Sequence, residues 1–236
     1  MLEKTIEITE LGIGLSEWEF LVLCNTCGIK DIVCFEQKMK EPSEEEGLQT
    51  LLDMVNRNLL IHSGDTFSLS EDVLSVMEVI EKRKFTIKMR LPESDIPDCC
   101  FYIGDGENLI LAEPGARENE YVVFKTLPKS VFEVFLESGG YIPKNEVSPE
   151  IQEIRRKVEY VELNGVEFTP FDGDAPNDYR FMAEVYMGDQ DIKYASMYVL
   201  WDKGNEILIE VSEMGKVADY YSEDRLVKEI LQLVGL

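Results

Sequence analysis

Positive charge is scarce in this chain. Its 236 residues carry 23 Lys and Arg against 47 Asp and Glu, a formal net charge of −24 at pH 7. Affinity for phosphate backbones and for anionic lipid headgroups comes mainly from Lys and Arg, so a protein this acidic repels both. One of the few basic clusters, Lys82-Arg83-Lys84, could contact an acidic partner, but we favour the interpretation that it offsets neighbouring acids. The composition therefore disfavours nucleic acid and membrane surfaces as partners.

Histidine and cysteine are also few, with one His62 and five cysteines. A Ser-His-Asp or Cys-His catalytic machine would depend on His62 alone, and the sequence contains no G-x-S-x-G or H-E-x-x-H motif. Cys24 and Cys27 have C-x-x-C spacing, but the other three cysteines do not supply the second well-spaced pair of a zinc site. We interpret the cysteines as core thiols of a reduced protein, and we expect no catalytic residue and no metal site.

Long apolar runs and phosphate-binding glycine loops are missing as well. No stretch approaches the roughly 18 to 20 apolar residues of a membrane span, and the acidic, alternating N-terminus does not have the pattern of an export signal. Gly104-Asp105-Gly106 lacks the third glycine of a nucleotide cradle, and Asp172-Gly173-Asp174 with Asp178 lacks a complete calcium loop. We therefore expect a soluble, cytoplasmic protein that begins at Met1 and needs no cofactor.

The apolar fraction of 44% is ample for a folded core. Ser16 and the acids after it predict a helix to about Cys27, ended by Gly28. A second helix begins near Ser43 and is followed by a hairpin over 61–69 and a helix over 71–80, which is the order of a winged-helix unit. The counterpart of a DNA-recognition helix, residues 48–60, has Arg57 as its only base, so DNA binding is disfavoured.

The pattern then changes from helical to alternating, and it does so twice. Four strands (85–91, 99–103, 108–112 and 120–125) precede a helix over 128–138, and four more (179–187, 195–201, 207–211 and 216–221) precede a final helix. This repetition predicts a duplication, with related halves 1–140 and 141–236 in a single domain. We expect an α+β fold in which the halves form one pseudo-twofold antiparallel sheet flanked by two helical bundles.

The first half also resembles a known family. The segment Leu15-Ser16-Glu17-Trp18-Glu19-Phe20-Leu21-Val22-Leu23, the leucine-rich helix that ends in Asn56-Arg57-Asn58-Leu59-Leu60-Ile61, and the hairpin before Leu69-Ser70 are similar to the opening of the EspG family, the cytoplasmic chaperones of type VII (ESX) secretion. The resemblance implies a non-enzymatic chaperone or adaptor that binds a helical secreted protein. The Lys, Glu and Ile usage looks like that of a low-GC Gram-positive relative, whose client would not be the PE–PPE pair.

The final helix is the candidate partner-binding element. Its apolar face is wider than the single stripe that a helix needs to dock on its own sheet, so the surplus could receive a client helix or could be buried by the rest of the bundle. The candidate partner-binding residues are Leu226, Val227, Ile230, Leu231 and Val234. Two other functions stay open: an immunity protein that neutralises a basic toxin, and a winged-helix transcriptional regulator.

Overall fold

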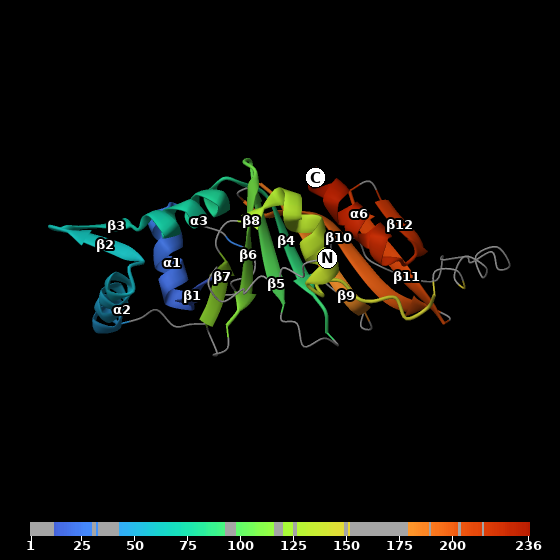
Figure 1. Cartoon of the computed structure of the whole chain (residues 1–236), viewed down its shortest axis with the longest axis horizontal. Helices are drawn as coiled ribbons and strands as arrows, with labels where there is room; N and C mark the ends of the chain where they lie inside the picture. Colours follow the sequence, from blue (N-terminus) through green and yellow to red (C-terminus); the bar gives the residue numbers. More distant parts are fainter. Residues whose placement is uncertain are drawn as a thin grey trace, which may run out of the picture. The chain divides into compact units, whose positions relative to one another are not determined.

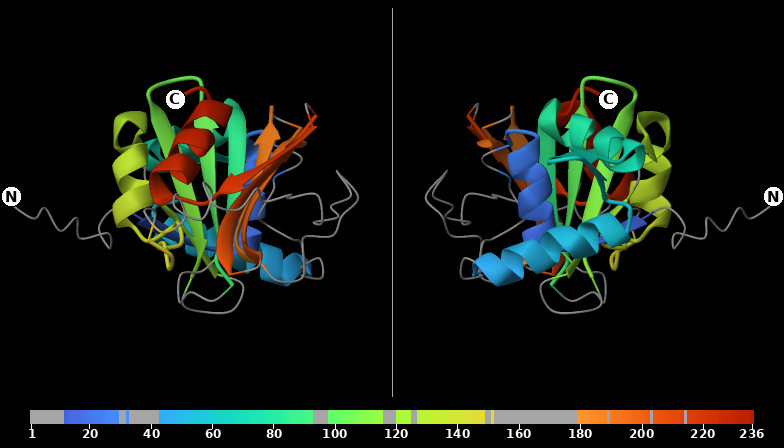
Figure 2. Two further views of the ribbon diagram at one scale, coloured as in Figure 1. Left: turned by 90° about the vertical axis from the view of Figure 1, so that its right-hand side faces the viewer. Right: turned by 90° about the vertical axis from the view of Figure 1, so that its left-hand side faces the viewer.

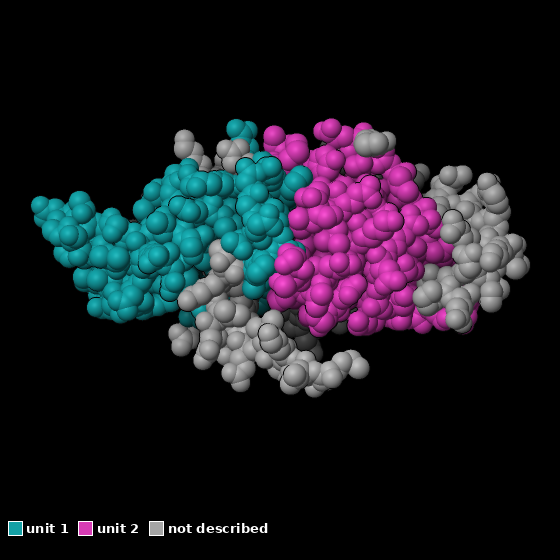
Figure 3. Space-filling view, turned by 45° about the horizontal axis from the view of Figure 1, so that its top comes forward, with its two compact units in different colours: residues 1–86, 99–129, 188–191 teal, residues 87–98, 130–187, 192–236 magenta. Residues whose placement is uncertain are grey.

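The computed structural model of the chain describes residues 12–29, 32, 43–92, 98–115, 120–124, 127–148, 151, 179–188, 190–202, 204–213 and 215–236 (Figure 1). These residues fall into two compact units, drawn in different colours in Figure 3. Unit 1 comprises Met1–Thr86, Cys99–Lys129 and Gly188–Asp191, and unit 2 comprises Ile87–Asp98, Ser130–Met187 and Ile192–Leu236. Among the described residues, no helix has the length and apolar character that crossing a bilayer requires.

Unit 1 begins with a strand, β1 (Gly12–Ser16), followed by α1 (Glu17–Thr26) and α2 (Glu44–Asn56). Both helices start with a capping box, in which a serine hydroxyl accepts from the backbone N–H of a glutamate three residues later and that glutamate accepts from the serine N–H. The pairs are Ser16 with Glu19 and Ser43 with Glu46. These local bonds explain why the two helices begin where they do.

A two-stranded hairpin and a third helix follow α2 in unit 1. Strands β2 (Leu60–Ser63) and β3 (Thr66–Leu69) pair antiparallel with Ser63 opposite Thr66, and α3 (Glu71–Glu81) comes next. Helix α3 buries one stripe of apolar side chains, Val73, Val76, Met77 and Ile80, and packs against β5 and β6. The winged-helix-like order expected from the sequence is therefore present.

The sheet of unit 1 has the strand order β1-β7-β6-β5, followed by the first residues of β4 (Arg83–Arg90). Its other strands are β5 (Cys99–Gly104), β6 (Asn108–Pro114) and β7 (Glu120–Phe124), with the two-residue β8 (Leu127–Pro128) paired to β6. Side chains from α1, α2 and α3 meet one face of this sheet in a core that includes Phe20, Met54, Ile80, Tyr102 and Ile110, each fully buried.

Unit 2 continues from the last residues of β4 into β9 (Tyr179–Met187), β10 (Ile192–Asp202), β11 (Asn205–Ser212) and β12 (Gly215–Tyr220), in that order. Neighbours from β9 to β12 pair antiparallel. A 3-10 turn (Lys129–Val131) leads into α4 (Phe132–Ser138), and α6 (Glu223–Leu233) follows β12. Helices α4 and α6 lie side by side, as both views in Figure 2 show.

The fold is α+β with extensive antiparallel sheet, as the sequence predicts. A run of strands followed by a helix occurs twice: β4 to β7 and the two-residue β8 precede α4, and the four strands β9 to β12 precede α6. That the halves 1–140 and 141–236 arose by duplication stays a prediction. The strand β1 was not predicted, because Gly12 and Gly14 weaken the alternating pattern of its five residues.

Candidate functional site

Most of the predicted partner-binding face belongs to the core of unit 2. Leu226, Val227, Ile230 and Val234 are between 0% and 4% exposed. Val227, Ile230 and Val234 follow Leu226 by one, four and eight residues, so the four side chains form a single stripe along α6 and its C-cap residue. These four side chains are buried, and Leu231 is the member of the set that is partly exposed, so the predicted role of the five residues in partner binding stays a prediction.

Leu231 lines a hollow of about 610 Å³ between α4 and the end of α6, called here the α4–α6 groove. Its lining residues are Glu133 and Glu137 from α4 and Asp224, Lys228, Leu231, Gln232, Gly235 and Leu236 from α6 and its C-terminal cap. The groove has an apolar part made by two leucines and a rim that is mainly acidic. An amphipathic helix can be held by such a surface through an apolar anchor and charged flanks.

The C-terminal cap of α6 brings the two leucines of the groove together. The Leu236 N–H donates to the Leu231 carbonyl at 2.9 Å, and the Gly235 N–H donates to the Gln232 carbonyl at 3.3 Å. This is a Schellman motif, and Gly235 has the left-handed φ of 69° that the motif requires. A Schellman motif typically places these two side chains in contact, so helix termination itself positions the apolar part of the groove.

A buried carboxylate fixes the segment that follows α4. Glu206, on β11 and fully buried, accepts from the backbone N–H groups of Glu146 and Val147 at 2.9 Å each and from Arg180. Glu223, the first residue of α6, accepts from the Asn145 backbone N–H at 2.9 Å. These charge-assisted bonds tie residues 145–147 to the sheet and to the first turn of α6, which supports a fixed position of α4 beside α6.

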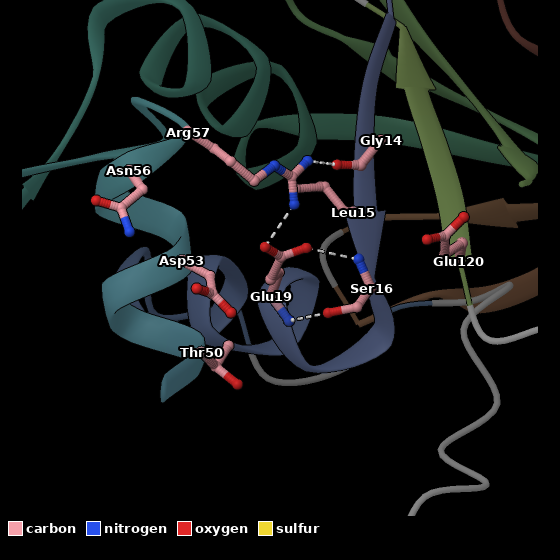
Figure 4. A pocket seen from close by; sticks show the side chains of 9 residues that line it. All are labelled: Gly14, Leu15, Ser16, Glu19, Thr50, Asp53, Asn56, Arg57 and Glu120. Carbon is pink, nitrogen blue, oxygen red and sulfur yellow. Dashed lines mark hydrogen bonds and ion pairs between the residues drawn. The ribbon is translucent and has the colours of Figure 1, made fainter. Parts of the chain in front are cut away.

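A second hollow, of about 740 Å³, lies in unit 1 and is called here the Arg57 pocket (Figure 4). Arg57 caps the end of α2 and donates to the Glu19 carboxylate at 2.6 Å and to the Gly14 carbonyl. Glu19 is 5% exposed, and its other oxygen accepts from the Ser16 N–H at 2.7 Å. The buried carboxylate is thus neutralised by one arginine, and Arg57 connects α2 to β1 and α1.

The rest of the Arg57 pocket is polar and acidic. Thr50 and Asp53 project from α2 on the side of Glu19, and Glu120 stands on β7 (Figure 4). Asp53 accepts from the Gln49 side chain at 2.9 Å. The sequence did not reveal this pocket, because Arg57 and Glu19 are 38 residues apart. The one hint of this pocket in the sequence was that Arg57 is the lone basic residue of segment 48–60, and in the structure Arg57 is paired with Glu19.

Metal-binding geometry is not found in the described part of the chain. No group of three or more His, Cys, Asp or Glu side chains there could hold a metal ion. His62 stacks on Phe67 in the β2–β3 hairpin, with ring centroids 4.8 Å apart. The acidic loop at Asp172, Asp174 and Asp178 lies outside the described residues.

Cys24, which is buried in α1, and Cys27, the partly buried C-cap of that helix, both have raised thiol pKa values. Burial, with a smaller contribution from Cys27, raises the pKa of Cys24 to about 12. Burial and the nearby Glu81 also raise the pKa of Cys27. Cys100, buried in β5, is disulfide-bonded, which departs from the fully reduced chain expected from the sequence, and Cys34 lies outside the described residues.

The fold has a counterpart among solved structures. The chain is similar to the Mycobacterium tuberculosis type VII secretion system chaperone EspG5, solved in complex with a PE25–PPE41 dimer. The TM-score is 0.52 at 13% sequence identity, over 94% of this chain and 95% of that one. The chain has an EspG-like fold. No family model and no curated protein matches the sequence.

The EspG-like fold agrees with the resemblance noted in the sequence, which rested on apolar pattern and element order. At 13% identity such agreement reflects the arrangement of helices and strands and not shared surface residues. The α4–α6 groove and the Arg57 pocket are therefore described from this chain's own side chains.

Proposed function

We propose that this protein is a non-enzymatic chaperone or adaptor that binds a helical secreted protein of a type VII secretion system. The observation that carries the proposal is the likeness to EspG5, a type VII secretion chaperone, which extends over nearly the whole of both chains. The resemblance of residues 15–70 to the EspG family supports it independently. We place the protein in the cytoplasm of a low-GC Gram-positive bacterium, with a client other than a PE–PPE pair.

The α4–α6 groove is the proposed docking site for the client. Leu231 and Leu236 provide an apolar floor, and Leu236 is 42% exposed. A client helix that inserts an apolar side chain between α4 and α6 would bury these groups without disturbing the core stripe of α6. The neighbouring core residues Leu226, Val227, Ile230 and Val234 then act by holding α6 in place.

The net charge of −24 suits a protein whose docking groove is exposed to solvent before the client binds. Mutual repulsion between copies keeps a molecule with an exposed apolar groove soluble and monomeric. Three acids at the rim, Glu133, Glu137 and Asp224, face the one base Lys228. A client whose apolar anchor is flanked by Lys or Arg would complement this rim.

Co-expression tests the proposal. The full chain would be expressed with candidate small helical secreted proteins, and co-purification would be measured at high salt. We expect Leu231→Asp to abolish capture while circular dichroism stays unchanged. The matched control is Leu74→Asp, an exposed leucine on α3 in the other unit, which should leave capture intact.

A second groove variant keeps the test decisive if Leu231→Asp reduces folding. Leu236→Asp changes a side chain that is 42% exposed and should weaken capture without loss of solubility. Equal capture by both groove variants and by the control would refute the groove as the docking site. A complex that falls apart at high salt would instead indicate the charge-dominated association of an immunity protein with its toxin.

A further inference from the structure

The outer side of α2 presents an apolar pair that the core of unit 1 does not use. Leu48 and Leu52, one turn apart, are each 57% exposed. The helix packs through a different side, on which Met54 is fully buried and Leu51 and Val55 contact the core cluster. Helix α2 therefore carries apolar residues in excess of those that attach it to unit 1.

This apolar pair borders an acidic surface. On the same helix, Gln49 and Asn56 are close neighbours of Leu52 around the helix axis, and Asn56 lines the Arg57 pocket together with Asp53. Glu44, Glu45 and Glu46 form the first turn. The one base of the pocket, Arg57, is already bound to Glu19 and to the Gly14 carbonyl. The described part of this surface therefore combines an apolar pair with several acidic side chains.

The charge decides which occupant fits. A second copy would bring the acids of two α2 helices together, each on a chain with a net charge of −24, so self-association by this face is opposed. Anionic nucleic acid and lipid are repelled for the same reason. We propose that the outer side of α2, with the adjoining Arg57 pocket, is a docking surface for a basic amphipathic helix of a partner protein. Its apolar side chains cover Leu48 and Leu52, and its Lys or Arg side chains reach toward Asp53.

This surface is independent of the α4–α6 groove and of the client proposed for it. The residues of the two surfaces belong to different units, so variants at one leave the other unchanged. A protein with both surfaces could hold a secreted client while it contacts a second, basic component. If the variants of α2 bind the basic helix as well as the unmodified chain does, the chaperone proposal still stands. If the groove variants capture the client normally, the proposal for α2 still stands.

The test uses a labelled synthetic helix of leucine and lysine, about 18 residues or five turns long. Its binding to the full chain is measured by fluorescence anisotropy at about 0.15 M salt, where non-specific attraction is partly screened. Leu48→Gln/Leu52→Gln removes the apolar pair and retains good helix formers, so the fold should be unchanged. The matched control is Leu74→Gln, which changes an exposed leucine on α3 in the same unit.

We expect the double variant to weaken binding by about tenfold or more, equivalent to about 1.4 kcal/mol, while the control stays within about twofold of the unmodified chain. Asp53→Lys, which reverses one charge of the pocket, should weaken binding as well. Equal binding by all variants, or equal binding of a peptide with glutamate in place of lysine, would overturn the proposal. A dimer that the double variant abolishes would overturn it too, because a second copy would then be the occupant.

Discussion

The buried ion pair between Arg83 and Asp191 offers a demanding test of the structure. Their side chains are 1% and 4% exposed. Asp191 accepts from Arg83 Nε at 3.1 Å, from Arg83 Nη2 at 2.9 Å and from the Thr86 hydroxyl at 2.9 Å, while Arg83 Nη1 donates to the Ile80 carbonyl at 3.0 Å. The charge pair is thus largely removed from water and supported by further hydrogen bonds. Arg83 belongs to the basic cluster noted in the sequence, and its acidic partner Asp191 is 108 residues away.

The informative substitution is Asp191→Asn. Asp191 has a left-handed φ of 46°, a conformation that asparagine also tolerates, so the variant removes the charge without adding backbone strain. It removes the charge that Asp191 places against the buried guanidinium, and breaking a buried ion pair in this way typically costs about 3–5 kcal/mol. We expect the free energy of unfolding, measured by urea denaturation with circular dichroism, to fall by about that amount.

The double variant Arg83→Met/Asp191→Asn provides the control. Because an apolar side chain of similar length replaces the buried guanidinium, most of the lost stability should return. A loss below about 1 kcal/mol for Asp191→Asn, or no recovery in the double variant, would refute the reasoning that the pair is desolvated and mutually dependent.

Three further predictions concern other parts of the chain. Gly139→Ala should destabilise the protein by about 1–3 kcal/mol in a thermal or urea melt. An added Cβ would lie 2.5 Å from the Phe135 carbonyl oxygen and 2.6 Å from the Tyr141 ring. An unchanged melt would mean that this turn can relax. Glu210→Gln should raise the melting temperature at pH 7, because burial first, and Glu229 second, raise the pKa of Glu210 and so penalise its ionised folded form. That gain should disappear as the pH falls below the ordinary value of 4.5, where the carboxyl is protonated in both folded and unfolded chains, and a gain that persists there would contradict the electrostatic explanation. Cys24 should react with iodoacetamide at pH 8 much more slowly in the folded protein than in a denatured control, because the thiol is buried and its pKa is about 12. Peptide mass spectrometry measures the two rates, and equal rates would contradict this prediction.

Local patterns allowed much of the fold to be predicted from the sequence. Ser16 and Glu19 form a capping box within four residues, and the β5–β6 hairpin is marked by its Gly-Asp-Gly turn, so these elements were visible in the chain itself. The short strand β1 was missed because its pairing with β7 lies about a hundred residues away, as in the register of Gly12 with Phe124. Long-range pairings leave little trace in local periodicity.

The candidate sites were less accessible to sequence reasoning. Apolar periodicity identified α6 correctly but could not divide its face into a buried stripe and a groove-lining edge, because that division depends on where α4 packs. Arg57 was noted only as an isolated base, and its role emerges from a contact with Glu19 on another helix. Contacts between distant segments decide which side chains remain available at a surface.

The division of α6 has an evolutionary consequence. Leu226, Val227 and Ile230 are constrained by packing inside unit 2, whereas Leu231 and Gln232 line a hollow on the neighbouring side of the same helix. Substitutions at the second pair can accumulate without altering the scaffold. Chains of this fold could thus diverge in the surface they present by changing a few neighbouring positions, and sequence variation among orthologues should concentrate there.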